Sequence, residues 1–148
     1  MTTAAAPDAD ALRTLVAEHG ALLLYDGTCG FCDRAVQLVL DHDRRGTMRF
    51  ATLAGPWGAA ARAAHPALEG VASVVLVDAG GAHVKSEAAL RVAAYLGGAW
   101  SLAGAARIVP RPLRDAAYDV VARVRHRIAG RLDACRLPDG PTRARFLG

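Results

Sequence analysis

The feature that most constrains the fold of this chain is a short, wholly apolar run, Ala21 to Tyr25. An apolar residue at every position is typical of a strand covered on both faces, because a strand with one wet face alternates apolar and polar residues. A helical period follows from Phe31 to Asp43, and a second strand candidate spans Met48 to Leu53. This order of strand, helix and strand predicts a βαβ unit with parallel pairing.

Later segments extend this pattern. Ser73 to Val77, in which β-branched residues dominate, predicts a strand, and Ala82 to Lys85 predicts the return strand of a hairpin. Ser86 is expected to cap the helix that follows. Helices are expected at Asp8 to His19, Trp57 to Ala64, Ser86 to Leu96, Ala99 to Arg107 and Leu113 to Arg131. The pattern therefore predicts an α/β sandwich about a small mixed sheet.

Length and composition narrow the class of protein. A chain of 148 residues suits one domain, and 53% hydrophobic with 22% charged residues excludes general disorder. Three cysteines are too few, and odd in number, for a disulfide-stapled fold. No run reaches the ~18 apolar residues of a membrane span. Met1 to Asp10 also lacks the basic start and apolar run of a signal peptide. We therefore expect a soluble, cytoplasmic protein.

A Cys-x-x-Cys motif, Cys29 and Cys32, lies between the buried strand and the helix that follows it. Two cysteines at this spacing close a small disulfide ring without unwinding the helix. The helix N-terminus stabilises a thiolate, the species that attacks a disulfide. Cys32 shares a helix face with Val36 and Val39, so we expect Cys32 to point inward and Cys29 to be more exposed.

This arrangement predicts a thiol-disulfide oxidoreductase of the protein-disulfide reductase type. Cys29 is assigned as the nucleophile and Cys32 as the resolving cysteine. Its partner is expected to be a protein or small-molecule thiol or disulfide. No cofactor is expected beyond the reversible Cys29–Cys32 disulfide.

Other residues of the same segment are candidates for shaping the reaction. Asp26 either accepts a proton during exchange or forms a turn with Gly27. Thr28 is placed to donate a hydrogen bond to the nucleophilic sulfur. Gly27 and Gly30 permit close approach of a backbone, and Phe31 is expected to shape access to the disulfide.

The main structural alternatives are a zinc site and cysteines that simply pack in the core. A closed zinc site needs two more ligands, and Cys135 with one of the five histidines would have to supply them. His126 and Cys135 are nine residues apart and form no second tight pair. We therefore predict no metal ion. A lone Cys135 is expected to be a small buried side chain, with exchange toward Cys29 as the alternative.

The net charge of +4 is unevenly distributed, since residues 107–148 carry +6 and residues 1–106 carry −2. Arg123, Arg127 and Arg131 recur every four residues, so they share one face of the predicted last helix. No nucleic-acid motif accompanies them, so we expect no nucleic-acid partner and only a weak contact with anionic surfaces. The alternative function is a non-enzymatic binding module. In that reading the cysteines are structural or hold a metal, and the basic helix docks an acidic partner.

The segment Asp26-Gly-Thr-Cys29-Gly-Phe-Cys32 resembles the Asp-x-x-Cys-x-x-Cys pattern of the DCC family of thiol-disulfide oxidoreductase-like proteins. Later blocks resemble the family in the same order: Ser73 to Val77, Ser86 to Leu90, Ile108 to Asp115, Tyr118 to Arg123 and Cys135 to Pro138. The resemblance implies a thioredoxin-like three-layer sandwich with extra C-terminal helices. Residues 21–138 would form this domain, residues 1–20 an N-terminal helical extension and residues 139–148 a tail.

One position departs from thioredoxins proper, which carry a cis-proline just before the strand that faces the disulfide. The matching position here, before Val74, is Ser73. In thioredoxins that proline positions the substrate backbone and keeps metals from the cysteines. Ser73 is therefore a candidate substrate-shaping residue, and it leaves the strength of disulfide reduction and metal binding open.

Overall fold

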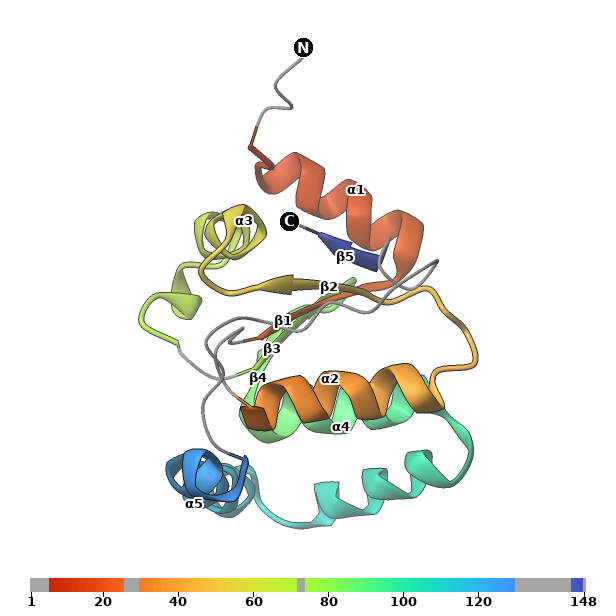
Figure 1. Cartoon of the computed structure of the whole chain (residues 1–148), viewed down its shortest axis with the longest axis vertical. Coiled ribbons are helices and arrows are strands. Elements are labelled where there is room, and N and C mark those ends of the chain that lie inside the picture. Colours follow the sequence, from red (N-terminus) through yellow and green to blue (C-terminus); the bar gives the residue numbers. More distant parts are fainter. Residues whose placement is uncertain (1–5, 26–29, 72–73, 130–144, 148) are drawn as a thin grey trace.

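The computed structural model describes residues 6–25, 30–71, 74–129 and 145–147 (Figure 1). Within these residues five strands form one mixed sheet in the order β4-β3-β1-β2-β5. The central strand β1 (Ala21–Tyr25) pairs in parallel with β2 (Arg49–Thr52) and antiparallel with β3 (Val75–Asp78). The edge strands are β4 (Gly81–Val84), antiparallel to β3, and β5 (Phe146–Leu147), parallel to β2. The predicted βαβ unit and hairpin are confirmed.

Strand β1 is buried at all five positions, as its apolar run predicts. Leu22 and Leu24 belong to the core on one side of the sheet, and Leu23 and Tyr25 to the core on the other. The alternation follows from the two-residue period of a strand. Because both faces carry leucine, both must be covered by other elements.

Helices cover the two faces of the sheet in separate pairs (Figure 1). On one face lie α1 (Ala9–His19) and α3 (Pro56–Ala64), and on the other lie α2 (Gly30–His42) and α4 (Lys85–Leu96). A short 3-10 helix, η1 (Pro66–Leu68), follows α3. These layers agree with the predicted thioredoxin-like α/β fold.

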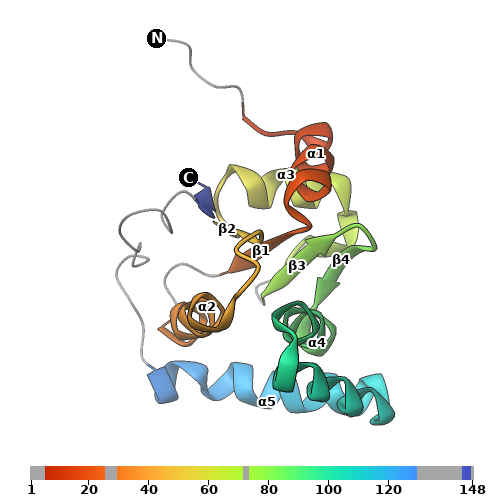
Figure 2. The same ribbon diagram turned by 90° about the vertical axis from the view of Figure 1, so that its right-hand side faces the viewer.

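Two further helices lie outside the layer of α2 and α4. The 3-10 helix η2 (Gly98–Ile108) packs against α4, and α5 (Arg111–Ala129) crosses beneath both α2 and α4 (Figure 2). They correspond to the helices predicted at residues 99–107 and 113–131. Among the described residues no helix is both long and apolar enough to cross a bilayer. The cytoplasmic location stays a prediction.

The ends of α1 follow the sequence signals. The Asp8 carboxylate accepts a hydrogen bond from the amide of Ala11 at 2.8 Å, which satisfies one free donor of the first turn. Gly20 has a φ of +87°, a left-handed conformation that glycine adopts without strain, and its amide donates to the carbonyl of Val16 at 2.7 Å.

The prediction that Ser86 caps α4 is wrong. The helix begins at Lys85 directly after Val84, and no side chain caps it. Instead, the Ser86 hydroxyl donates a hydrogen bond to the carboxylate of Asp115 on α5. Val84 is already the last residue of β4, so Lys85, with a φ of +54°, makes the turn into the helix and Ser86 is carried inside it.

Strand β5 was absent from the sequence predictions, which placed its residues in a tail. Phe146 pairs with Phe50 and Leu147 with Ala51 in parallel register. The ring of Phe146 also stacks on that of Phe50 at a centroid distance of 5.1 Å. Two residues are too few to show a strand period. The domain boundaries themselves stay a prediction.

A polar network ties α2, β2, α4 and the start of β5 together around Asp43, whose side chain is fully buried. The Tyr95 hydroxyl donates to Asp43 Oδ2 at 2.9 Å and accepts from the Met48 amide at 3.0 Å. Arg145 donates to the same Asp43 oxygen and, through Nε, to the Met48 carbonyl at 3.0 Å. The amide of Gly46 donates to Asp43 Oδ1 at 3.0 Å. The loop after α2, the helix α4 and the residue before β5 thus share one carboxylate.

We expect Tyr95→Phe to lower the free energy of unfolding by about 1–3 kcal/mol, because the Met48 and Thr47 amides lose this acceptor and Asp43 loses one of its donors, while the ring remains. Urea unfolding followed by circular dichroism measures this cost. Ser101→Ala is the control, since its exposed hydroxyl donates to the nearby Gly98 carbonyl. That variant should cost less than ~0.5 kcal/mol. Equal costs for the two variants would contradict the role given to Tyr95.

The stabilisation from Asp43 should depend on pH. Burial acts to raise the pKa of Asp43, but hydrogen bonds from Gly46, Arg145 and Tyr95 outweigh it, so the pKa lies below 3.8. The folded-state pKa is thus lower than the unfolded one, and the ionised carboxylate stabilises the fold above about pH 4. We expect Asp43→Asn to cost about 1.5–3 kcal/mol at neutral pH. This cost should shrink as the pH falls below about 4. Urea unfolding of both proteins across pH measures the difference, and a constant difference would refute the assignment.

Candidate functional site

The sheet has one edge at which β1 and β2 both end. Tyr25 pairs with Thr52 there, and Leu24 pairs with Val75, the first residue of β3. From this edge β1 leads into α2 on one face of the sheet, whereas β2 leads into α3 on the other face (Figure 1). A crevice where neighbouring parallel strands send their helices to opposite faces is the usual place for a site in an α/β sheet.

The Cys-x-x-Cys motif spans the start of α2 at this edge. Strand β1 ends at Tyr25 and α2 begins at Gly30, so Cys29 directly precedes the helix and Cys32 is its third residue. The first turn of an α-helix has amide groups without intrahelical partners and a partial positive charge. The motif is therefore flanked by a strand and a helix, as predicted.

Several predicted site residues lie outside the described residues. These are Asp26, Gly27, Thr28, Cys29, Ser73 and Cys135. For Gly30, Phe31 and Cys32 the backbone is helical, and the side chains of residues 30–35 are outside the description. Their assigned roles stay predictions.

The inward face of α2 is confirmed further along the helix. Val36 and Val39 are 3% and 5% exposed, and both belong to the core that contains Leu23 and Tyr25. Cys32 precedes Val36 by four residues, one helical turn, so its position falls on the same stripe. Leu38, off this stripe, is 43% exposed.

Tyr25 packs rather than facing solvent, as expected. It is 2% exposed and its ring meets that of Phe146 edge-on, with the centroids 6.5 Å apart. The last residue of β1 is therefore held between α2 and the β5 edge of the sheet.

A polar cluster that the sequence analysis missed joins α4 to α5 at the same edge of the sheet. Val84 pairs with Val75, so α4 starts beside the strand ends described above. Lys85 Nζ contacts Asp119 Oδ1 at 3.0 Å, and Ser86 bonds Asp115. Burial raises the pKa of Asp115 less than the Ser86 hydrogen bonds lower it, so the pKa lies below 3.8.

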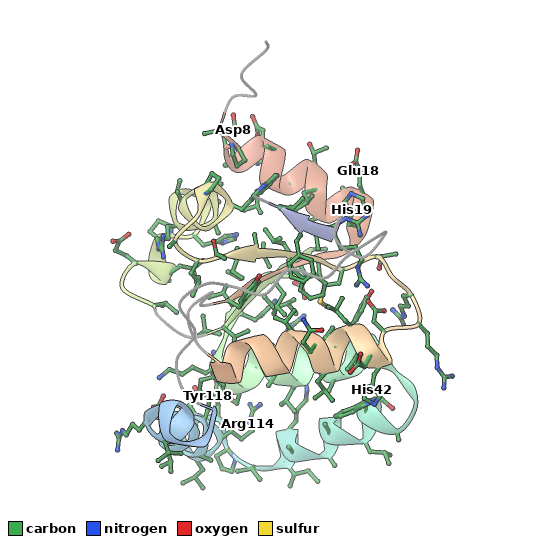
Figure 3. The ribbon with its side chains drawn as sticks, in the orientation of Figure 1. Asp8, Glu18, His19, His42, Arg114 and Tyr118 are labelled. Carbon is green, nitrogen blue, oxygen red and sulfur yellow. The ribbon has the colours of Figure 1, made fainter. Side chains whose placement is uncertain are left out.

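Glu87 is the centre of this cluster. Its carboxylate lies 3.2 Å from both Arg91 Nε and Arg107 Nη2, and 3.5 Å from Arg114 Nη1. Burial acts to raise the pKa of Glu87, but the three guanidinium groups outweigh it, and the pKa falls below 4.5. Figure 3 shows Arg114 projecting from α5 toward the helix layer. One carboxylate thus anchors η2 and α5 to α4.

The structure describes the side chain of one of the three arginines in the stripe predicted on the last helix. Arg123 is exposed, whereas the side chains of Arg127 and Arg131 lie outside the described ones. The C-terminal part of α5 passes beneath α2 (Figure 2). The contact of this stripe with anionic surfaces stays a prediction.

A cavity among the described residues lies apart from the Cys-x-x-Cys motif, and no metal-binding cluster is found among these residues. Among the described residues no group of three His, Cys, Asp or Glu side chains is close enough to hold a metal ion. A cavity of about 470 Å³ is lined by Ala21, Met48 and Asp78, among others. These residues mark the opposite edge of the sheet from Tyr25, so the cavity is remote from the Cys-x-x-Cys turn.

Comparison with known proteins gives the relationship of the chain. The profile of the DCC1-like thiol-disulfide oxidoreductases matches residues 23–131. The uncharacterized protein YuxK of Bacillus subtilis is 32% identical over 85% of this chain and 93% of its own length. A chloroplastic DCC family protein of Arabidopsis thaliana is 35% identical over 78% of this chain and 69% of its own length. No solved structure matches. The chain therefore belongs to the DCC1-like thiol-disulfide oxidoreductase family.

Proposed function

We propose that this protein is an enzyme that catalyses thiol-disulfide exchange through Cys29 and Cys32. The observation that carries the proposal is the position of the motif, between the end of the central buried strand and the first turn of α2. The family supports a redox role in general terms. The helix N-terminus supplies what the chemistry needs, because its free amides and partial charge favour the thiolate.

The proposed reaction has two exchange steps. The Cys29 thiolate attacks one sulfur of a substrate disulfide, which breaks that disulfide, forms a mixed disulfide and releases one substrate thiolate. The Cys32 thiolate then attacks the Cys29 sulfur and releases the second substrate thiolate. Two electrons pass from the cysteine pair to the substrate, and the pair ends as the Cys29–Cys32 disulfide. A dithiol reductant from outside the protein then reduces the Cys29–Cys32 disulfide by the same exchange chemistry, and is itself oxidised to a disulfide.

The neighbouring residues complete the proposed site. We assign Asp26 as a proton acceptor during exchange, and Thr28 as a hydrogen-bond donor to the nucleophilic sulfur. Gly27 and Gly30 let a substrate backbone approach, while Phe31 and Ser73 shape the access. The substrate is a protein or small-molecule disulfide, and no bound cofactor or metal takes part.

Redox titration tests the pairing of the two cysteines. We expect Cys29 and Cys32 to become protected from alkylation together, as a single two-electron couple, across a series of glutathione buffers. Differential alkylation with mass spectrometry measures the fraction oxidised at each site. Cys135→Ser is the matched control and should leave the titration of the pair unchanged. Independent titration of the two thiols would contradict the proposal, and stoichiometric zinc lost in Cys29→Ser would favour the binding-module alternative.

Single substitutions test the order of the two steps. In a Cys135→Ser background, Cys32→Ser should react with an aromatic disulfide probe, release half of it and retain the other half on Cys29. The unmutated pair should release both halves and leave no adduct. Cys29→Ser should react far more slowly, because the thiol favoured by the helix N-terminus is gone. Absorbance of the released thiolate and the intact protein mass measure these outcomes. An adduct retained on Cys32 instead would reverse the assigned roles.

A further inference from the structure

The segment that joins α4 to α5 leaves large apolar side chains in water. No residue of η2 is buried, and Leu102, Ile108 and Leu113 are 75%, 86% and 63% exposed. Val109 and Trp100 are 42% and 37% exposed. Apolar side chains scattered singly over a surface need no explanation, but a concentration of them along one short segment marks an interaction surface.

We call this surface the η2 face and define it by its exposed apolar and cationic residues. These are Trp100, Leu102, Arg107, Ile108, Val109, Arg111 and Leu113. It lies on the outer side of α4, away from the sheet (Figure 1). The ring of His42 meets the Trp100 ring edge-on at 5.1 Å, which holds one end of the face against α2.

The charges bordering the η2 face are positive. Residues 88–114 contain four arginines and no acidic residue. Arg107 and Arg111 expose 50% and 58% of their side chains at its margin. Arg107 shares Glu87 with two other arginines, and Arg111 lies 3.6 Å from Asp115. Arg91 also contacts Asp78 at 3.2 Å, so three arginines face two carboxylates here, and the margin keeps a positive charge.

We propose that the η2 face binds the surface of a membrane that contains anionic lipids. Leucine, isoleucine and tryptophan side chains enter the boundary between headgroups and acyl chains, while arginines reach the phosphates. A helix lying in the interface binds through one apolar face and needs no spanning length. The η2 face contains no cysteine, so this proposal is independent of the thiol chemistry.

The charge pattern favours a lipid surface over a second copy of the chain. A two-fold contact would place the η2 face of one copy against that of the other. Arg107 and Arg111 of the two copies would then lie close together and repel each other. An anionic bilayer instead supplies negative charge and apolar depth together. An acidic protein matches the arginines but not the exposed leucine and isoleucine side chains.

Binding of the full chain to vesicles tests the proposal. We expect sedimentation with vesicles of phosphatidylcholine and phosphatidylglycerol, weaker binding to phosphatidylcholine alone, and loss of the difference at high salt. Leu102→Ser with Ile108→Ser should weaken binding at least about tenfold, because each removes a large buried apolar contact from the complex. Arg107→Gln with Arg111→Gln should weaken binding to anionic vesicles about fivefold or more and reduce its salt dependence.

Matched variants serve as controls. Leu102→Met with Ile108→Met keeps the apolar contact and should bind like the wild type. Arg13→Gln with Arg62→Gln removes two cations from α1 and α3, on the opposite face of the molecule, and should also leave binding unchanged. Circular dichroism melts check that each variant is folded.

Three results would overturn the proposal. The first is wild-type protein that fails to bind anionic vesicles, or binds them equally after the two serine substitutions. The second is a concentration-dependent dimer, seen by light scattering, that the serine variant abolishes while vesicle binding is absent. The third is binding to polyglutamate without binding to vesicles, which would assign the η2 face to an acidic protein.

Discussion

Burial of β1 on both faces is the constraint on which the other parts of the structure depend. Its leucines alternate between two cores, so the sheet needs α1 and α3 on one side and α2 and α4 on the other. The helix after β1 therefore lies on one face, and the helix after β2 on the other. In the sequence the Cys-x-x-Cys motif follows β1 and enters α2, at the edge where these paths diverge, so its place in the fold follows from how the central strand is covered.

The parts of the fold that the sequence predicted are those with local signals. The apolar run of β1, the glycine after α1 and the β3–β4 hairpin each lie within a few residues, and so does the step from Tyr25 into α2. The parts that were missed depend on partners far along the chain. Ser86 bonds Asp115, 29 residues away, and Tyr95 bonds Asp43, 52 residues away. No local pattern reports such pairings, so the Glu87 cluster was also missed.

The uneven charge of the chain takes on a structural meaning in the fold. Among the described ion pairs, two acidic groups of the first 106 residues bind arginines of the last 42: Asp43 binds Arg145, and Glu87 binds Arg107 and Arg114. Opposite charge therefore holds η2, α5 and β5 against the sandwich. Part of the positive charge counted in the sequence is thus neutralised internally, while Arg123 is among the arginines that stay exposed.

The attachment of β5 has a consequence for the order of folding. Arg145 reaches Met48 and Asp43 across 97 and 102 residues, the longest separations among the described side-chain hydrogen bonds. Closing so long a loop costs more conformational entropy than forming the β3–β4 hairpin or the β1–α2–β2 unit. We therefore expect the fifth strand to join the sheet late, and β2 to present an unpaired edge until then. An unpaired edge of this kind can pair with a second copy of the chain.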